Sequence, residues 1–368
     1  ERPLLLGIDI GGTGTKAGVF TLDGDLVGSG YGEYQMISTV PGQAEHDAEL
    51  WWQATIKAVK DSLQDADPDD IKAIGVGCTN GLIAVDEKGR PLRPAIMLWD
   101  QRALPEVERI SDRLGAENVF SVTGNPLAPG AYSLPTLLWL KYHEPQSYAA
   151  AYKLMVPGGY LVARLTGEFT IDHSRASTTL LFDIRKRRWH TPFLSALDID
   201  PGKLPRPVAC DEVVGTVTEQ AAGLTGLKAG TPVVGGCMDT IGASLGTGVL
   251  DEGQCFVIMG TAASARNTSQ SCRGYPVKGT SGDANTATSS TAAVAPYTIP
   301  VYAQRSSFFL RFRPMVKYPA DIIPAERARR SPRRALPPRP KAPNPRTTAP
   351  EIATRIPNQW RPVGFSPR

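Results

Sequence analysis

The sequence predicts an α/β protein whose first domain is a mixed β-sheet with crossover helices. Three observations support this fold class. Apolar segments of strand length, such as residues 4–10 and 71–77, end in glycine-rich turns. The first segments follow the order strand, strand, strand, helix, strand, which is typical of a mixed sheet. A hydrophobic content of 41% in 368 residues is enough to bury a large core.

The N-terminal elements can be assigned in chain order. Residues 4–30 predict two or three strands joined by tight turns, with Asp23-Gly24 as a hairpin signal. Asp47 is the expected N-cap of a helix over about 48–64. The apolar stripe of this helix comprises Trp52, Ile56, Val59 and Leu63. Further strands are expected over 71–77, 82–85 and 94–98.

The later elements mix helices and strands. Helices are expected over 104–116, 135–143 and 160–165, the last of them ending at Gly167. Strands are expected over 213–217 and 232–234, a turn at 220–223 and a helix over 241–246. A final strand, residues 253–259, leads into Gly260-Thr261 and so repeats the pattern of residues 4–16. Two such turns from related domains can hold the phosphates of one nucleotide.

Asp239 follows the apolar segment 232–234 and the pair Gly235-Gly236. An acid in this place lies at the carboxyl end of a strand, where open α/β sheets bind their ligands. The glycines allow a substrate to approach the backbone closely. The same acid also fits the N-cap of the helix that follows it. Both interpretations remain open from these residues.

Asp9 ends the first strand and precedes the turn Gly11-Gly12-Thr13-Gly14. The backbone N–H groups of such a turn and its threonine hydroxyl can bind an anion, and the acid can hold Mg²⁺ through water. Because the turn leads into another strand, it is neither a Walker loop nor a dinucleotide fingerprint. An ordinary glycine-rich hairpin is the alternative.

Asp100 and Arg102 stand two residues apart after the strand at 94–98. They can face one pocket, with the acid accepting hydrogen bonds from sugar hydroxyls. A surface ion pair is the alternative. The spacing predicts polar side chains at a further strand end without choosing between the two.

Composition excludes several classes of protein. There is no apolar segment of about 18 residues, so we expect no membrane span. The 5 cysteines form no CxxC pair and the 4 histidines are scattered, which supports neither a zinc site nor a Ser/His/Asp triad. The N-terminal segment enters a strand directly rather than a signal peptide. We therefore expect a cytoplasmic protein with free thiols.

Taken together, these segments resemble the FGGY family of carbohydrate kinases. The match comprises Asp9-Ile10-Gly11-Gly12-Thr13, Asn80-Gly81, Asp100-Gln101-Arg102-Ala103, Ser133–Leu140, Leu165–Glu168, Asp172–Thr179, Gly236-Cys237-Met238-Asp239 and Gly260-Thr261-Ala262. The sequence departs from the family pattern at Thr13, which is shifted by one position, and at Thr136, where lysine is usual. The resemblance covers about residues 1–270 and looks closest to kinases of L-xylulose or D-xylulose, with polyol kinases as near neighbours.

The resemblance implies an actin/hexokinase-like (ribonuclease H-like) ATPase fold and transfer of the γ-phosphate of ATP to a hydroxyl of a ketopentose or related sugar or polyol. It implies that Asp239 accepts the proton of the attacking hydroxyl and that Asp9 holds Mg²⁺ on the phosphates. The implied nucleotide contacts are Asp9, Gly11, Gly12, Thr13, Thr15, Lys16, Gly260 and Thr261. The implied sugar contacts are Asn80, Asp100, Arg102, Asp239 and Thr240. The expected partners are thus a sugar and ATP, and a homodimer stays open.

Residues 272–368 differ sharply in composition from the rest of the chain. They hold 17 Lys and Arg against 4 Asp and Glu, whereas the other residues hold 23 against 32. They also contain 16 of the 32 prolines but only 2 leucines. We interpret 1–248 as a sugar-binding domain, 249–270 as the start of a second domain, and 271–368 as out-of-frame translation or disordered chain. Little or no kinase activity is then expected.

Two alternatives belong to other functional classes. The first domain can be a sugar-binding module without catalysis, or the basic tail can bind an acidic partner. The tail has few aromatic residues and no RNA or DNA motif, so we expect no nucleic-acid partner. Sugar binding without ATP favours the first alternative, and steeply salt-dependent DNA binding favours the second.

Overall fold

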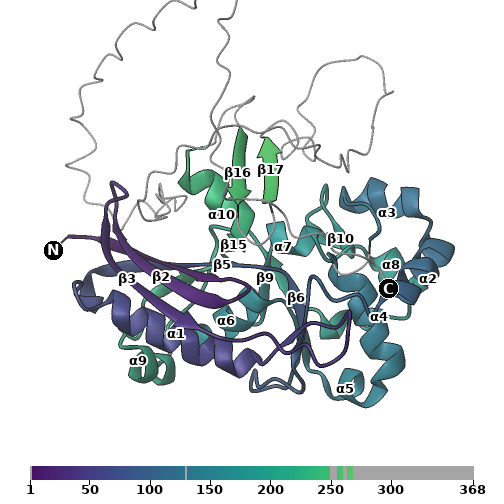
Figure 1. Cartoon of the computed structure of the whole chain (residues 1–368), viewed down its shortest axis with the longest axis horizontal. Helices are drawn as coiled ribbons and strands as arrows, with labels where there is room; N and C mark the ends of the chain where they lie inside the picture. Colours follow the sequence, from purple (N-terminus) through teal and green to yellow (C-terminus); the bar gives the residue numbers. More distant parts are fainter. Residues whose placement is uncertain (1, 129–130, 249–254, 260–262, 268–368) are drawn as a thin grey trace, which may run out of the picture. The chain divides into compact units, whose positions relative to one another are not determined.

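The computed structural model describes residues 2–128, 131–248, 255–259 and 263–267 (Figure 1). The chain divides into two units, residues 1–317 and 318–368, and every described residue belongs to the first. The strands are β1 (Leu4–Ile10), β2 (Gly14–Thr21), β3 (Leu26–Glu33), β4 (Glu45–His46), β5 (Ile71–Cys78), β6 (Gly81–Val85), β7 (Ala95–Met97), β8 (Lys153–Met155), β9 (Thr170–Asp172), β10 (Phe182–Asp183), β11 (Arg188–Trp189), β12 (Arg206–Val208), β13 (Val213–Thr216), β14 (Pro232–Val234), β15 (Cys237–Met238), β16 (Cys255–Met259) and β17 (Ala263–Asn267). The α-helices are α1 (Ala48–Ser62), α2 (Leu104–Leu114), α3 (Ala116–Thr123), α4 (Ser133–His143), α5 (Pro145–Ala150), α6 (Pro157–Thr166), α7 (His173–Ser177), α8 (Thr191–Ala196), α9 (Glu219–Thr225) and α10 (Asp239–Gly246).

A seven-stranded mixed sheet forms the centre of the domain, in the order β13-β14-β5-β1-β2-β3 with β15 also paired to β5. β5 runs parallel to β1, β14 and β15, whereas the β1–β2, β2–β3 and β13–β14 pairs are antiparallel. β1, β5 and β15 therefore end at the same edge of the sheet, which is where an open α/β sheet binds its ligands.

Three glycines let helix α1 lie directly on strand β3 (Figure 1). Gly28, Gly30 and Gly32 recur at every second residue, so all three point to one face of the strand. A Cβ on any of them would overlap a backbone carbonyl of the helix. Asp47 caps this helix by accepting a hydrogen bond from the Glu49 N–H at 2.9 Å.

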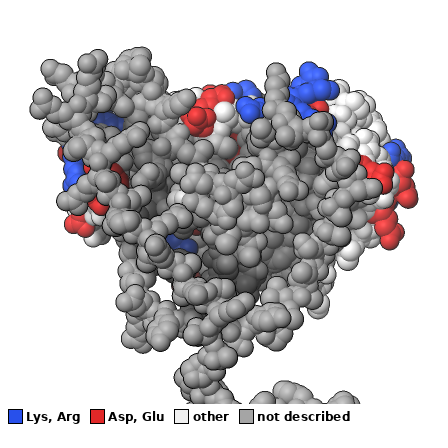
Figure 2. All heavy atoms as spheres, turned by 90° about the horizontal axis from the view of Figure 1, so that it is seen from above, with Lys and Arg blue, Asp and Glu red and all other residues white. Residues whose placement is uncertain are grey.

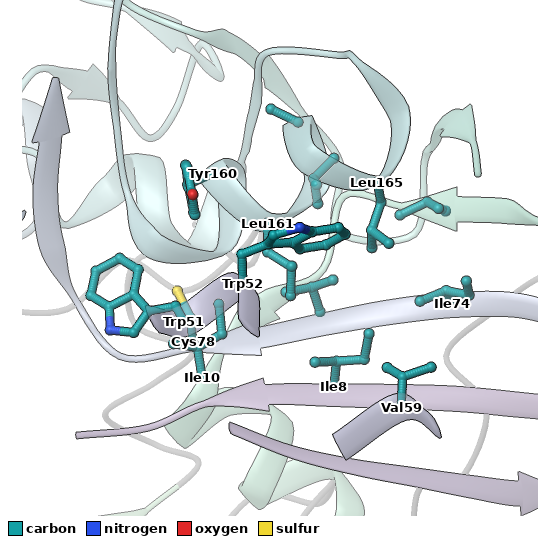
Figure 3. Close-up of a cluster of buried hydrophobic side chains, with 14 of the residues drawn as sticks. Ile8, Ile10, Trp51, Trp52, Val59, Ile74, Cys78, Tyr160, Leu161 and Leu165 are labelled. Carbon is teal, nitrogen blue, oxygen red and sulfur yellow. The ribbon is translucent and has the colours of Figure 1, made fainter. Parts of the chain in front are cut away.

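The main core lies between the sheet and the helices α1 and α6, as Figure 3 shows. Alternate residues of β1, among them Ile8 and Ile10, point into it, and Trp51 and Trp52 of α1 are almost fully buried. A second core joins the four-stranded sheet β4-β7-β6-β8 to helices α2, α4 and α8. Burial of this much apolar surface is the main stabilising contribution to the fold.

The predicted order of strands and helices is confirmed through β7, except that the two-residue strand β4 was not predicted. The Asp47 cap and the antiparallel hairpin after Asp9 are also confirmed. The turn predicted at 220–223 is wrong, because these residues lie in helix α9, which Thr218 caps through the Ala221 N–H. The helix predicted over 104–116 is two helices, divided at Gly115 with φ +76°. The polar segment after residue 170 forms β9 and the short helix α7.

Strands β16 and β17 form an antiparallel hairpin in which Met259 pairs with Ala263. The strand predicted over 253–259 is confirmed as β16, whereas β17 was not predicted; together they repeat the antiparallel arrangement of β1 and β2. The predicted phosphate contacts Gly260 and Thr261, which connect the two strands in the sequence, lie outside the described residues. The same holds for 271–368, so the proposed boundaries at 248 and 270 and the out-of-frame interpretation stay predictions.

Acidic and basic side chains lie side by side on the described surface that Figure 2 displays. In the part of the chain that the structure describes, no helix is both long and apolar enough to cross a bilayer.

Candidate active site

Asp9 lies near the carboxyl end of β1, on the face of the sheet opposite helix α1. It pairs in register with Lys16 of β2 and with Gly77 of β5. A Cβ placed on Gly77 would come within 3.5 Å of Asp9 Oδ1, so the glycine keeps the space beside the carboxylate open. Oδ1 is buried and has no hydrogen-bond partner among the described residues. Burial raises the pKa of Asp9, although the nearby Lys16 lowers it.

Two tyrosines hold the turn that follows Asp9. Tyr34 Oη donates a hydrogen bond to the Gly11 carbonyl at 2.7 Å, and Tyr31 Oη donates to the Thr13 carbonyl at 3.2 Å. The Gly11 N–H closes the turn onto the Gly14 carbonyl at 3.0 Å. The turn is thus fixed by bonds to its carbonyl groups, and the Thr13 side chain stays exposed.

Two nucleotide contacts were predicted on β2. Lys16 lies on the same face of the sheet as Asp9, whereas Thr15 lies on the opposite face. Side chains alternate along a strand, and Lys16 stands beside Asp9 whereas Thr15 points toward the core. Thr15 is 0% exposed. The buried Thr15 hydroxyl has no hydrogen-bond partner among the described residues, but it lies on the opposite face of the sheet from Asp9, so this arrangement does not support its predicted contact with phosphate.

Trp99 also lies against the turn. Its ring edge lies 3.1 Å from the position of a Cβ on Gly12, and its side chain is half-exposed. His46 lies beneath it, with ring centroids 6.3 Å apart. Trp51 donates a hydrogen bond to His46 Nδ1 at 3.0 Å, and burial lowers the pKa of His46 to about 4. The ring is neutral near pH 7 and carries its proton on Nε2.

Asp239 is the first residue of helix α10 and directly follows β15. Its Oδ1 accepts a hydrogen bond from the Thr240 N–H at 2.6 Å, which is a bond to the first turn of the helix. The next side chain, Thr240, has a buried hydroxyl without a partner in the described part of the chain. The N-cap interpretation of Asp239 is wrong, because Met238 is the N-cap and Asp239 is already helical. The site interpretation stays a prediction, and the helix N-terminus lies at the edge where β1 and β5 end.

Asp100 and Arg102 form an ion pair, but it is buried rather than on the surface. Asp100 accepts four hydrogen bonds, from the Ala44 N–H and from three N–H groups of Arg102, at 2.6–2.9 Å. Arg102 also pairs with Glu45 at 2.7 Å and lies 4.9 Å from the ring centroid of Trp139. With every acceptor direction of Asp100 in use, its predicted contact with sugar hydroxyls does not fit the observed bonding.

Asn80 follows β5 and uses its amide on nearby backbone. Nδ2 donates to the Ala131 carbonyl at 2.9 Å, and Oδ1 accepts from the Gly81 N–H at 3.0 Å. The second amide N–H and a carbonyl lone pair stay available for a ligand. Asn80 also lines a small hollow with Tyr132 and Ser133 of the α4 region.

Comparison with known proteins identifies the family. The model for the N-terminal domain of the FGGY family of carbohydrate kinases matches residues 4–246. The chain belongs to the FGGY family. Within it, the xylulose kinase of Staphylococcus xylosus is 34% identical over 262 residues, which cover 71% of this chain and 54% of that protein.

Two further FGGY relatives agree with this assignment. The L-xylulose/3-keto-L-gulonate kinase of Escherichia coli K12 is 33% identical, with 70% of this chain and 53% of the relative covered. The crystal structure of xylulose kinase from Rhodospirillum rubrum superimposes with a TM-score of 0.68 at 28% identity, covering 71% of this chain and 54% of that one. The chain spans about half the length of the curated relatives it matches. The actin/hexokinase-like α/β fold implied by the sequence is confirmed.

The Mg²⁺ that FGGY membership implies fits the residues at this edge. Asp9 offers a buried oxygen without a partner in the described chain, and Mg²⁺ in kinases is bound by one or two carboxylates together with phosphate oxygens and water. Among the described residues, no group of three or more His, Cys, Asp and Glu side chains could hold a metal ion. A Mg²⁺ ion would therefore depend on the phosphates of a bound nucleotide.

Sequence reasoning missed three side chains that lie next to the predicted site residues. Trp99 and Tyr34 contact the turn after Asp9, and Arg175 of α7 lies fully buried behind the segment that leads to Asp239. Nothing in the spacing of these residues marks them. A buried arginine is invisible in a sequence until its partners are known, because arginine is usually exposed.

Proposed function

We propose that this domain binds a ketopentose of the xylulose type, and that it is the sugar-binding half of an ATP-dependent kinase. The observation that carries the proposal is the pair Asp9 and Asp239. Asp9 lies near the carboxyl end of β1 and Asp239 directly follows β15, and these two strands flank β5 on either side at one edge of the sheet. The sugar class is inferred from two relatives, a xylulose kinase and an L-xylulose/3-keto-L-gulonate kinase.

In the proposed reaction Asp239 accepts the proton of the attacking sugar hydroxyl, and Thr240 donates a hydrogen bond to the sugar. Positioning of this kind provides most of the catalysis in phosphoryl transfer. Lys16 stands on the Asp9 face and can neutralise phosphate charge there. Mg²⁺, held by Asp9, would shield the negative charge of the phosphates.

The first test is calorimetric titration of the 368-residue chain with D-xylulose. Separate titrations with L-xylulose, xylitol and gluconate test the other candidate sugars. We expect saturable binding of a ketopentose without ATP, and a loss of about tenfold or more in Asp239→Asn, because a buried hydrogen bond to the sugar is removed. Asp112→Asn, which changes an exposed acid on α2, is the matched control. Absence of binding to every sugar would contradict the proposal.

For this chain we propose sugar binding with little or no phosphoryl transfer. The support is the composition of residues 272–368, which is rich in arginine and proline and poor in leucine, unlike an α/β domain. Robust ATP-dependent phosphorylation of a ketopentose by the purified chain would contradict it. Resequencing the coding DNA around codons 260–280 and translating all three frames tests the out-of-frame interpretation directly.

A further inference from the structure

Helix α7 contacts the segment that leads to Asp239 at two points. The Arg175 guanidinium donates to the Gly235 carbonyl at 3.0 Å, and the Ser174 hydroxyl accepts from the Met238 N–H at 3.0 Å. These two contacts bracket Gly235–Met238, which we call the approach segment. Asp239 begins α10 immediately after it.

Arg175 is fully buried and uses each side of its guanidinium. Nε pairs with Asp172 Oδ2, Nη1 donates to Cys78 Sγ at 2.9 Å, and Nη2 reaches the approach segment. Asp172 is itself 0% exposed and caps α7 by accepting from the Ser174 and Arg175 N–H groups. The planar fork of arginine suits such a three-sided arrangement, which a lysine cannot reproduce.

The surrounding backbone leaves space for this guanidinium. A Cβ on Gly158 would overlap Nη1 of Arg175, and the Gly158 N–H donates to Cys78 Sγ at 3.0 Å. Gly236 takes φ +81°, and a Cβ there would overlap the Val76 carbonyl and lie 3.0 Å from Nη2. Both positions therefore require glycine while Arg175 stays where it is.

We propose that Arg175 is a positioning residue that, together with Ser174, holds the approach segment so that Asp239 stays in the sugar site. This inference rests on the proposed function, in that Asp239 contacts the sugar. A side chain that merely stabilised the core would need no contact with the approach segment. Here both α7 contacts fall on the connection between β14 and α10, next to the predicted catalytic acid.

Three variants test the inference. Arg175→Met combined with Asp172→Asn removes the buried pair without leaving one charge alone, and the asparagine can still cap α7. Arg175→Lys keeps the charge opposite Asp172 but cannot also reach Cys78 and Gly235. Ser174→Ala removes the contact with the Met238 N–H and the hydrogen bond that the Ser174 hydroxyl donates to Asp172, but it deletes no charged group. Arg164→Met is the matched control, because Arg164 of α6 pairs with Glu49 and Tyr160 instead.

Two measurements are made on the full chain. Hydrogen exchange reports the Gly236 and Met238 amides, which bond to the Cys210 carbonyl and to Ser174 Oγ, and calorimetry gives the affinity for D-xylulose. We expect exchange in the approach segment to rise about tenfold or more in the α7 variants, while β1 and β5 keep their protection. D-xylulose affinity should fall about 10- to 100-fold, since the loss of a hydrogen bond to a charged group weakens binding by about this factor. The control should change neither quantity.

The outcomes separate the two proposals. If the wild-type chain binds no sugar, the proposed function fails and hydrogen exchange alone decides the role of Arg175. If the wild type binds D-xylulose but folded Arg175→Lys and Ser174→Ala match it in exchange and affinity, the positioning role is overturned. If the double variant does not fold, these two single variants carry the test.

Discussion

Two strand ends of this domain hold a buried acid, and they differ in how the acid is satisfied. Asp100 is 1% exposed and accepts four hydrogen bonds, three of them from Arg102. Asp9 Oδ1 is also buried, yet no described residue donates to it. A buried polar group without a partner is costly unless something binds it, so it is the better sign of a ligand site. Asp100 is by the same reasoning a structural residue.

The largest expected loss of stability comes from substituting Asp100, the buried acid whose hydrogen bonds are all made within the protein. Asp100→Ala leaves Arg102 buried without its main partner, and breaking a buried pair costs about 3–5 kcal/mol of unfolding free energy. Urea denaturation measures this loss. Asp61→Ala, which removes an exposed i,i+4 pair with Lys57, is the control and should cost less than about 1 kcal/mol. Equal losses in the two variants would contradict the structural role of the buried Asp100–Arg102 pair.

The satisfied site also shows where sequence reasoning reaches its limit. Spacing along the chain identified Asp100 and Arg102 as polar residues at a strand end. Their bonding, however, depends on Ala44 and Glu45, and Ala44 lies 56 residues before Asp100. The β1–β2 hairpin was predictable because apolar period and turn chemistry are local signals. Arg175 was not, since its three partners come from β5, β9 and the segment after β14.

A smaller, pH-dependent change in stability is expected from substituting Asp9, whose buried Oδ1 has no hydrogen-bond partner among the described residues. Burial raises the pKa of Asp9 above its ordinary value of 3.8, so the folded state holds this proton more tightly than the unfolded state. The associated stability is fully present below pH 3.8 and is lost as pH rises through the raised pKa. Asp9→Asn should remove this pH dependence and unfold no more easily than the wild type at pH 7. Urea denaturation from pH 4 to 8 without Mg²⁺ measures the difference, and a clear loss of stability at pH 7 would contradict it.

The smallest effect is expected at Gly12, in the turn beside Asp9. A Cβ there meets the ring edge of Trp99 at 3.1 Å, and this half-exposed ring can shift by a few tenths of an ångström. Gly12→Ala should therefore lower the unfolding free energy by less than about 1 kcal/mol while it changes Trp99 fluorescence. In Gly30→Ala, by contrast, the new Cβ overlaps the Ala58 carbonyl of α1, and overpacking against backbone costs about 1–3 kcal/mol. If Gly12→Ala lowered the unfolding free energy more than Gly30→Ala, the turn would be as tightly packed as the core. The interpretation of the Asp9 site as open would then be wrong.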